Sequence, residues 1–277
     1  MGYRRNIIKM AEKTLPDQIA DLLIALVFTE KLTAGNKLPP ERQLAEYLGV
    51  DRTSLRIALK ILTRMNVVHT LQGSGITVLD YKVHCGFDLL ADVYQIETLE
   101  LGGEYLLSAL DLFSHAMPVA LRLSIQRSEN TSKSAQGNVL SIVHKMHQSL
   151  QSTDCFRELA QLEIELIDTL LESTQNIFVQ LTGSSSREIR QALVEKNYEL
   201  IDVKAHLDWM VAMMMRIAGG VADMDEMMKL YAAHIEETSQ PLKDYLSTLP
   251  PKPQLMSSPL RNGRNIMDLD EIMGKNK

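Results

Sequence analysis

Two arginines and two hydroxyl side chains fall within five residues of one another: Arg52, Thr53, Ser54 and Arg56. Arginine can form paired hydrogen bonds with guanine or phosphate, and hydroxyl groups at the start of a helix can hold phosphates. Arg42 supplies a third cation a short distance upstream. This combination is typical of a protein surface that contacts the DNA backbone and reads bases in the major groove.

The residues around these cations predict a helix, a tight turn and a second helix. Pro40 and Glu41 suit the start of the first helix, where a missing N–H costs nothing and a negative charge meets the positive end of the helix dipole. Gly49 allows a left-handed cap that ends this helix, and Asp51 is a good N-cap for a second helix that begins at about Arg52. Apolar residues at helical spacing give each helix a buried face: Leu44, Ala45 and Leu48, then Leu55, Ala58, Leu59 and Leu62.

A short hairpin is predicted to follow the two helices. Residues 67–71 and 76–79 have strand composition, and the turn between them contains Gln72 and Gly73. An additional helix before the pair is marked by apolar residues at helical spacing: Ile19, Leu22, Leu23 and Leu26. Together these elements predict a winged helix-turn-helix DNA-binding domain over residues 1–80.

The charge of the chain is distributed unevenly. All 277 residues together carry a net charge of −6, which argues against a general nucleic-acid coat protein. Residues 1–80 nevertheless hold 11 Lys and Arg against 8 Asp and Glu, a net charge of +3, and the remainder carries −9. The positive charge therefore lies where the DNA-binding motif is predicted.

The cysteines and the apolar segments indicate where the protein acts. Cys85 and Cys155 form neither a disulfide framework nor a metal-binding spacing, so a reducing cytoplasm is expected. Residues 1–13 lack an apolar core of signal-peptide length, and the apolar run 209–221 is short and interrupted by Arg216. We expect a cytoplasmic protein with no membrane partner.

The rest of the chain predicts a mainly α fold. Residues 84–249 show repeated helical periodicity, which favours an antiparallel bundle of six or seven helices. Pro118 should kink or divide one of these helices. Residues 250–277 begin with three prolines and then become polar, so a flexible tail is predicted there. Four methionines lie close to Trp209 in the sequence: Met210, Met213, Met214 and Met215. Such a cluster can line a ligand cavity or form part of an ordinary core helix.

Residues 39–45 (Pro-Pro-Glu-Arg-Gln-Leu-Ala) and 51–56 (Asp-Arg-Thr-Ser-Leu-Arg) resemble the signature of GntR-type bacterial transcription regulators. The helical remainder resembles their FadR-like, fatty-acid-responsive subgroup, above all at residues 86–90, 156–159 and 173–176. The resemblance implies a homodimer on a palindromic double-stranded DNA operator, with a metabolite sensed by the helical domain. It assigns DNA contacts to these residues: Arg42, Arg52, Thr53, Ser54, Arg56, and Gln72 and Gly73 at the wing tip.

The same resemblance bears on the effector. Many relatives hold a divalent metal with three histidines and an acid; His206 and His234 match two of these histidines, and Arg157 stands at the third. Because a cation opposes metal binding, we expect no metal and no other cofactor, and a hydrogen-bonded pair of core histidines is the alternative. An acyl-CoA or another anionic metabolite is the expected effector, with Arg122 and Arg157 at its head group and the Met213 region along its tail. His206 and His234 complete the set of predicted effector-binding residues. A regulator without a ligand remains an open alternative.

Other classes of protein are less well supported by the sequence. The pairs His144/His147 and Asp111/His115 have metal-binding spacing but no third ligand nearby, and no phosphate loop, nucleophile elbow or CxxC motif is present, so we predict no enzyme. A metal-binding GntR-type regulator of carboxylate metabolism and a winged-helix module without DNA binding are the alternatives. Three cations around one helix start argue against the latter.

Overall fold

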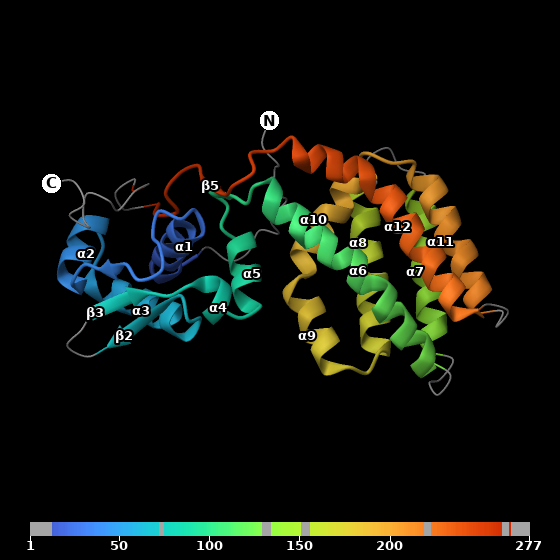
Figure 1. Cartoon of the computed structure of the whole chain (residues 1–277), viewed down its shortest axis with the longest axis horizontal. Coiled ribbons are helices and arrows are strands. Elements are labelled where there is room, and N and C mark those ends of the chain that lie inside the picture. Colours follow the sequence, from blue (N-terminus) through green and yellow to red (C-terminus); the bar gives the residue numbers. More distant parts are fainter. Residues whose placement is uncertain are drawn as a thin grey trace. The chain divides into compact units, whose positions relative to one another are not determined.

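A computed structural model of the chain describes residues 13–71, 75–128, 134–150, 156–218, 223–261 and 266. The chain divides into two compact units, residues 1–102 with 250–277 and residues 103–249. Helices dominate both units, and the described strands are confined to the first (Figure 1). The predicted fold class is confirmed: a winged helix-turn-helix is followed by a helical domain.

The first unit is built around α1 (Leu15–Phe28), in which every residue from Ile19 to Phe28 is buried. Thr14 and Asp17 form a capping box that fixes where α1 begins. One buried acid, Asp21, bonds to the Lys13 ammonium at 2.6 Å, and burial raises the pKa of Asp21 to about 6. A helix that is apolar on all sides suits a position packed between α3 and α5.

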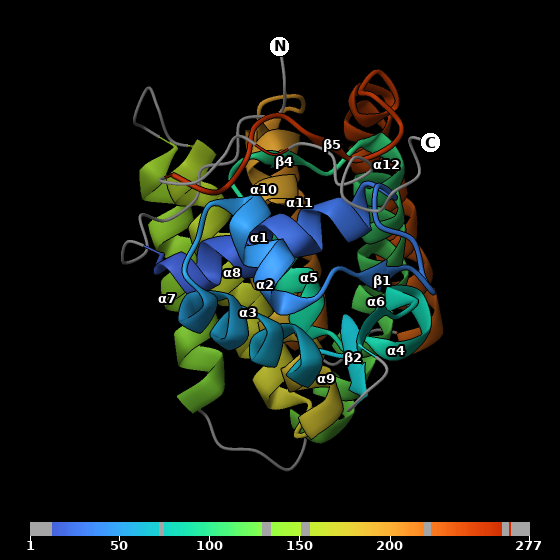
Figure 2. The same cartoon turned by 90° about the vertical axis from the view of Figure 1, so that its left-hand side faces the viewer.

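The helix-turn-helix consists of α2 (Glu41–Leu48) and α3 (Arg52–Arg64), and α3 packs against both α1 and α2 (Figure 2). Gly49 ends α2 with a left-handed φ of 69°, as predicted. The wing is a three-stranded antiparallel sheet in the order β1-β3-β2, made of β1 (Lys37–Leu38), β2 (Val68–Leu71) and β3 (Gly75–Val78). Strand β1 was not predicted, because two residues are too few to show alternation.

The C-terminal segment differs from the expected flexible tail. After α4 (Tyr81–His84) and α5 (Asp88–Tyr94), β4 (Leu99–Glu100) pairs antiparallel with β5 (Gln254–Leu255). Leu255 and Leu260 are buried in the first unit. The helical domain was expected to begin at residue 84, but residues 81–102 belong to the first unit and the second unit begins at Gly103. Composition reveals a proline-rich segment but not the distant strand with which it pairs.

The second unit contains seven helices within its described ranges: α6 (Gly103–Ser128), α7 (Ser134–Ser149), α8 (Phe156–Ser173), α9 (Ile177–Ser185), α10 (Arg187–Tyr198), α11 (Val203–Ala218) and α12 (Met224–Ser247). Helix α9 was not predicted, because its serine, threonine and glycine content hides its periodicity. Pro118 does not divide α6, which continues to residue 128. By length and composition alone α6 would pass for a membrane span, but it packs against α8, α10 and α12.

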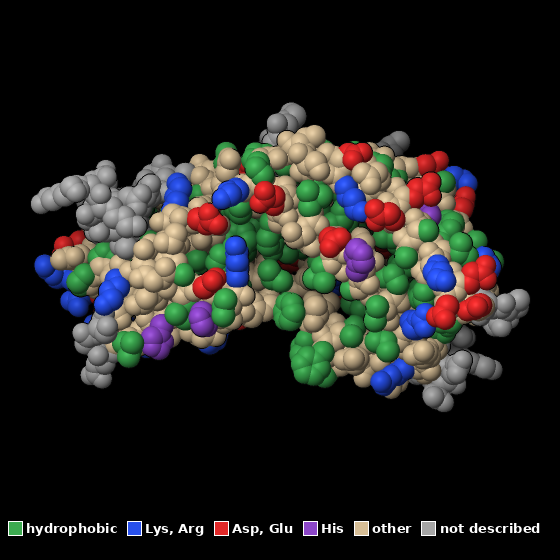
Figure 3. Space-filling view, viewed as in Figure 1, with side chains coloured by type: hydrophobic (Ala, Val, Ile, Leu, Met, Phe, Trp, Pro, Cys, Tyr) green, Lys and Arg blue, Asp and Glu red, His purple; other side chains and the backbone are tan. Residues whose placement is uncertain are grey.

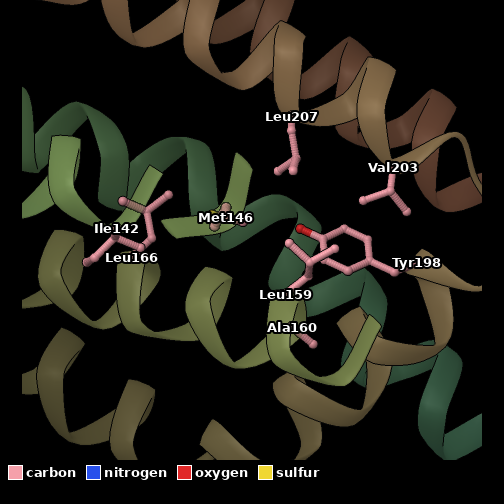
Figure 4. Close-up of a cluster of buried hydrophobic side chains, with 8 residues drawn as sticks. All are labelled: Ile142, Met146, Leu159, Ala160, Leu166, Tyr198, Val203 and Leu207. Carbon is pink, nitrogen blue, oxygen red and sulfur yellow. The ribbon is translucent and has the colours of Figure 1, made fainter. Parts of the chain in front are cut away.

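Apolar side chains from α7, α8, α10 and α11 form the core cluster shown in Figure 4: Ile142, Met146, Leu159, Ala160, Leu166, Tyr198, Val203 and Leu207. The methionines of α11 do not act as one patch. Met213 is buried with Met227 and Met228 against Trp209, whereas Met215 is 69% exposed. Met213 therefore belongs to the core.

Substitution of two glycines that have left-handed backbone conformations tests whether the C-terminal segment packs closely against residue 102. Gly102 has φ +78°, and a Cβ there would lie 2.6 Å from the Pro251 carbonyl oxygen; Gly35 has φ +86° but open space around it. Gly35→Ala should cost about 1 kcal/mol, the usual penalty for a side chain in this conformation. Gly102→Ala should cost about 1–3 kcal/mol more because backbone must also move. Urea unfolding followed by circular dichroism measures both; equal losses would contradict the close packing of residues 102 and 251.

Candidate DNA interface and effector cavity

The start of α3 is held by Asp51. Its carboxylate accepts hydrogen bonds from the Ser54 backbone N–H at 2.8 Å and from the Ser54 hydroxyl at 2.7 Å. The hydroxyl bond is the main reason that the pKa of Asp51 is lowered, followed by the backbone bond. Ser54 is thus engaged in capping, so the predicted contact from its hydroxyl competes with the cap.

The other predicted DNA contacts lie on exposed surface. Arg52 and Thr53 are exposed, and no ion pair engages Arg52 within the described residues. The Arg56 guanidinium bonds to the Glu41 carboxylate at 2.6 Å, and Arg42 lies 3.3 Å from Glu46. Exposed pairs of this kind contribute little stability, so a DNA phosphate can replace either carboxylate.

Sequence reasoning missed one cation of this surface. Lys60 is exposed on α3, one turn beyond Arg56, which is itself one turn beyond Arg52. The i, i+4, i+8 spacing was visible in the sequence and could have revealed it. Ile57, 46% exposed beside this row, offers the apolar contact that a thymine methyl group takes. We call Arg52, Arg56 and Lys60 the basic row. Figure 3 shows Lys and Arg side chains at the end of the first unit where α2 lies.

The wing tip is defined only by its flanks. Gln72 and Gly73 lie outside the described residues. Strands β2 and β3 pair from Val68↔Val78 to Leu71↔Gly75, so residues 72–74 connect them. Gly75 has φ +91°, a conformation that glycine adopts without strain.

The helical unit contains a cavity of about 100 Å³ lined by α6, α8, α10, α11 and α12. Its walls are largely apolar: Leu110, Phe113, Met117, Leu193, Ile235 and Leu242 contribute to them. Polar groups also line it, including His206, Glu163, Arg190 and Asn197. An apolar hollow with a few polar groups is the usual form of a small-molecule site.

Arg190 is the buried cation of this cavity, and only 6% of its side chain is exposed. Nη2 donates to the Gly183 carbonyl at 2.8 Å and to Asp168 at 3.1 Å, and Nε donates to the Ser186 hydroxyl at 3.3 Å. Burial lowers the pKa of Arg190, while Asp168 acts in the opposite direction. An arginine stays charged in proteins, so the cavity wall carries a positive charge.

The predicted effector residues are not brought together. His206 alone among them lines the cavity. Arg122 pairs with Asp225, and Arg157 is exposed on α8. Met213 lies in the core. Arg190 and Asn197 were missed, although a cation and an amide two turns apart, with apolar Leu193 and Val194 between them, were a readable signal.

The two histidines lie against each other, and no third metal ligand accompanies them among the described residues. Nδ1 of His206 lies 3.0 Å from Nε2 of His234, so they are hydrogen-bonded to each other, and the His234 ring stacks on Trp209 with 3.7 Å between centroids. No group of three His, Cys, Asp or Glu gathers anywhere in the described ranges. Two imidazoles without a third His, Cys, Asp or Glu beside them are too few protein donors for a tetrahedral or octahedral metal ion.

The other histidine pairs from the sequence lie on the surface. His144 is exposed, and its Nε2 accepts a hydrogen bond from the Gln148 side-chain amide at 2.9 Å. His147 bonds to the Val143 carbonyl of its own helix and lies 3.6 Å from the Asp208 carboxylate. His115 bonds to the Asp111 carbonyl at 2.8 Å. These contacts are those of solvated helix faces.

Comparison with known proteins defines the N-terminal domain. Residues 15–78 match the family model "Bacterial regulatory proteins, gntR family". The HTH-type transcriptional regulator Mce2R of Mycobacterium tuberculosis is 32% identical over 120 residues, 43% of this chain and 50% of that protein. The putative L-lactate dehydrogenase operon regulatory protein of Escherichia coli is 48% identical over 63 residues, 23% of this chain and 24% of that protein.

A solved structure of Lar, which controls the expression of the Listeria monocytogenes agr system, aligns with 85% of this chain and 99% of its own, at 16% identity and a TM-score of 0.49. The matched region spans half the length or less of the two curated relatives. Residues 15–78 form a GntR-family helix-turn-helix domain, and the proteins that it resembles are regulators, not enzymes.

The buried histidines make the stability of the helical unit depend on pH. Burial lowers the pKa of His206 and of His234 to about 4, below the ordinary value of 6.5. As the pH falls from about 6.5 toward 4, the unfolded chain takes up protons that the folded chain does not, so stability falls by up to roughly 1.4 kcal/mol per pH unit for the buried His206. The half-buried His234 contributes less, because solvent screens it.

His206→Asn should reduce this slope, as measured by urea unfolding between pH 7 and 5. Trp209, the single tryptophan of the chain, reports on this unit by its fluorescence. His144→Asn, on an exposed face, is the matched control and should leave the slope unchanged. A slope as steep in His206→Asn as in the unaltered protein would show that burial of His206 is not its cause.

Proposed function

We propose that this protein is a DNA-binding transcription regulator of the FadR-like subgroup of the GntR family, controlled by a small-molecule effector. The basic row of α3 carries this proposal, because it projects from a capped helix start in a domain that matches the GntR family. The cation spacing of one helical turn fits contacts with successive phosphates and base edges of one groove. Such a regulator acts in the cytoplasm, where its DNA is.

The DNA target that we propose is a palindromic operator bound by a homodimer. Each protomer inserts the start of α3 into the major groove of one half-site, with Arg52 and Arg56 toward bases and phosphates. The net charge of +3 on residues 1–80 favours association with DNA, whereas the −9 elsewhere keeps the rest of the chain away from it. Arg42 and Thr53 position the domain on the backbone.

The effector acts through the helices that line the cavity. The chain passes between its two units twice, just before α6 and just after α12. Both helices contribute cavity walls, and a Cβ at Gly103 would lie 2.4 Å from the Leu246 carbonyl oxygen, so the start of α6 is packed tightly on the end of α12. A ligand that favours one arrangement of α6 and α12 thereby biases both connections to the DNA-binding unit.

Removing two cations of the basic row tests DNA binding. Arg52→Ala/Arg56→Ala should weaken binding to a duplex selected by the unaltered protein by about 2–6 kcal/mol in total, because each arginine contributes about 1–3 kcal/mol. The dependence of affinity on salt concentration should also become shallower, since fewer counterions are released. Fluorescence anisotropy at several salt concentrations measures both quantities.

Lys145→Ala/Lys229→Ala is the matched control. It also removes two positive charges, but from exposed positions of α7 and α12 in the helical unit. We expect its affinity and salt dependence to stay close to those of the unaltered protein. Equal losses in the two double variants would mean that only overall charge matters, and the assignment of α3 as the recognition helix would then fail.

A further inference from the structure

We infer that the cavity of the helical unit binds a short aliphatic carboxylate that also carries a hydroxyl or amine donor, without a metal. This inference deepens the proposed effector role and rests on it. It differs from the acyl-CoA expected from the sequence, whose head group was assigned to Arg122 and Arg157. Neither of those arginines lines the cavity.

The first supporting observation is an unused donor on Arg190. Its Nε and Nη2 atoms bond to the protein, but Nη1 is buried and has no hydrogen-bond partner in the described part of the chain. A buried N–H without a partner is costly, and native structures nearly always satisfy it. A carboxylate oxygen is the partner that a guanidinium binds most strongly.

The second observation is an unused acceptor on the same helix face. Oδ1 of Asn197 is also buried without a partner among the described residues. Residues 190 and 197 are two helical turns apart, so they face the same side of α10, with roughly 10 Å of helix rise between them. An acceptor at this place calls for a hydroxyl or ammonium donor at the end of the ligand away from its carboxylate.

The charges around Arg190 leave room for an anion. Asp168 is its counter-ion, yet the same carboxylate also binds Arg187 at 2.7 Å, so two cations share one negative charge. The acid that lines the cavity is Glu163, which accepts a hydrogen bond from the Tyr198 hydroxyl, and burial raises the pKa of Glu163. This favours its neutral form and so reduces repulsion of a bound carboxylate.

The walls and the volume of the cavity determine the alkyl part and the size of the ligand. Phe113 on α6 and Ile235 on α12 are among the apolar side chains that would cover an alkyl chain. A cavity of about 100 Å³ is well below the roughly 300–1,000 Å³ typical of drug-sized ligands. A molecule of a few carbons fits this volume.

Three matched probes separate the two recognition groups: 4-hydroxybutyrate, butyrate, which lacks the hydroxyl, and 1,4-butanediol, which lacks the charge. Isothermal titration calorimetry of the full chain with EDTA present should rank them in that order. We expect butyrate to bind about tenfold more weakly than 4-hydroxybutyrate, and the diol about a hundredfold more weakly, as for the loss of a neutral and of a charge-assisted hydrogen bond.

Variants assign these differences to residues. Asn197→Leu should remove the advantage of 4-hydroxybutyrate over butyrate, because the acceptor that distinguishes the two acids is lost. Arg190→Lys should weaken the binding of both acids at least tenfold. Arg190 also supports the fold, so this variant can be unstable. In that case Asn197→Leu alone still tests the inference. Arg122→Ala is the matched control, since it removes an arginine outside the cavity lining, and should change neither affinity.

Two results would overturn the inference: no binding of any probe at millimolar concentration, or equal binding of the diol and the acids. Either could occur while Arg52→Ala/Arg56→Ala still loses DNA binding, and the proposed regulator would then stand with a different ligand. Conversely, binding of 4-hydroxybutyrate that depends on Asn197 but leaves DNA affinity unchanged would keep the site and refute its effector role.

Discussion

The turn between α2 and α3 is the constraint on which the DNA-binding surface depends. Gly49 reverses the chain in a left-handed conformation, and Asp51 fixes the first residue of α3 by accepting two hydrogen bonds from Ser54. A shift of one residue in this start would rotate α3 by about 100°. Leu55, Ala58 and Leu62 would then leave the core, and the basic row would no longer face outward. Packing and recognition therefore share one determinant.

In the helical unit, the main constraint is the burial of polar groups. Its cavity places a cation and an amide among apolar walls, where each polar atom without a partner costs stability. The histidines beside it avoid this cost by bonding to each other and by staying neutral. Arg190 and Asn197 retain one unused atom each. That contrast is why we place ligand recognition on α10 instead of on the histidines.

How much could be predicted from the sequence depended on the range of the interactions. The helix-turn-helix was predictable because Gly49 and Asp51 act on residues within one turn of themselves. The pairing of β4 with β5 was not, because it joins residues 99–100 to 254–255 and neither segment shows strand periodicity. The burial of Arg190 also depends on long-range packing: five helices meet around its side chain, which is 6% exposed, whereas the side chain of Arg122 is 39% exposed.

Selection of DNA by the full-length protein from a random-sequence duplex pool tests the central claim most directly. The account predicts enrichment of a two-fold symmetric sequence whose half-sites are centred about one helical turn, or a multiple of it, apart, since two α3 helices read them together. Sequencing of the bound fraction reports this symmetry and spacing whatever the operator sequence is. Recovery of DNA with no enriched sequence would contradict the claim that this chain is a sequence-specific regulator.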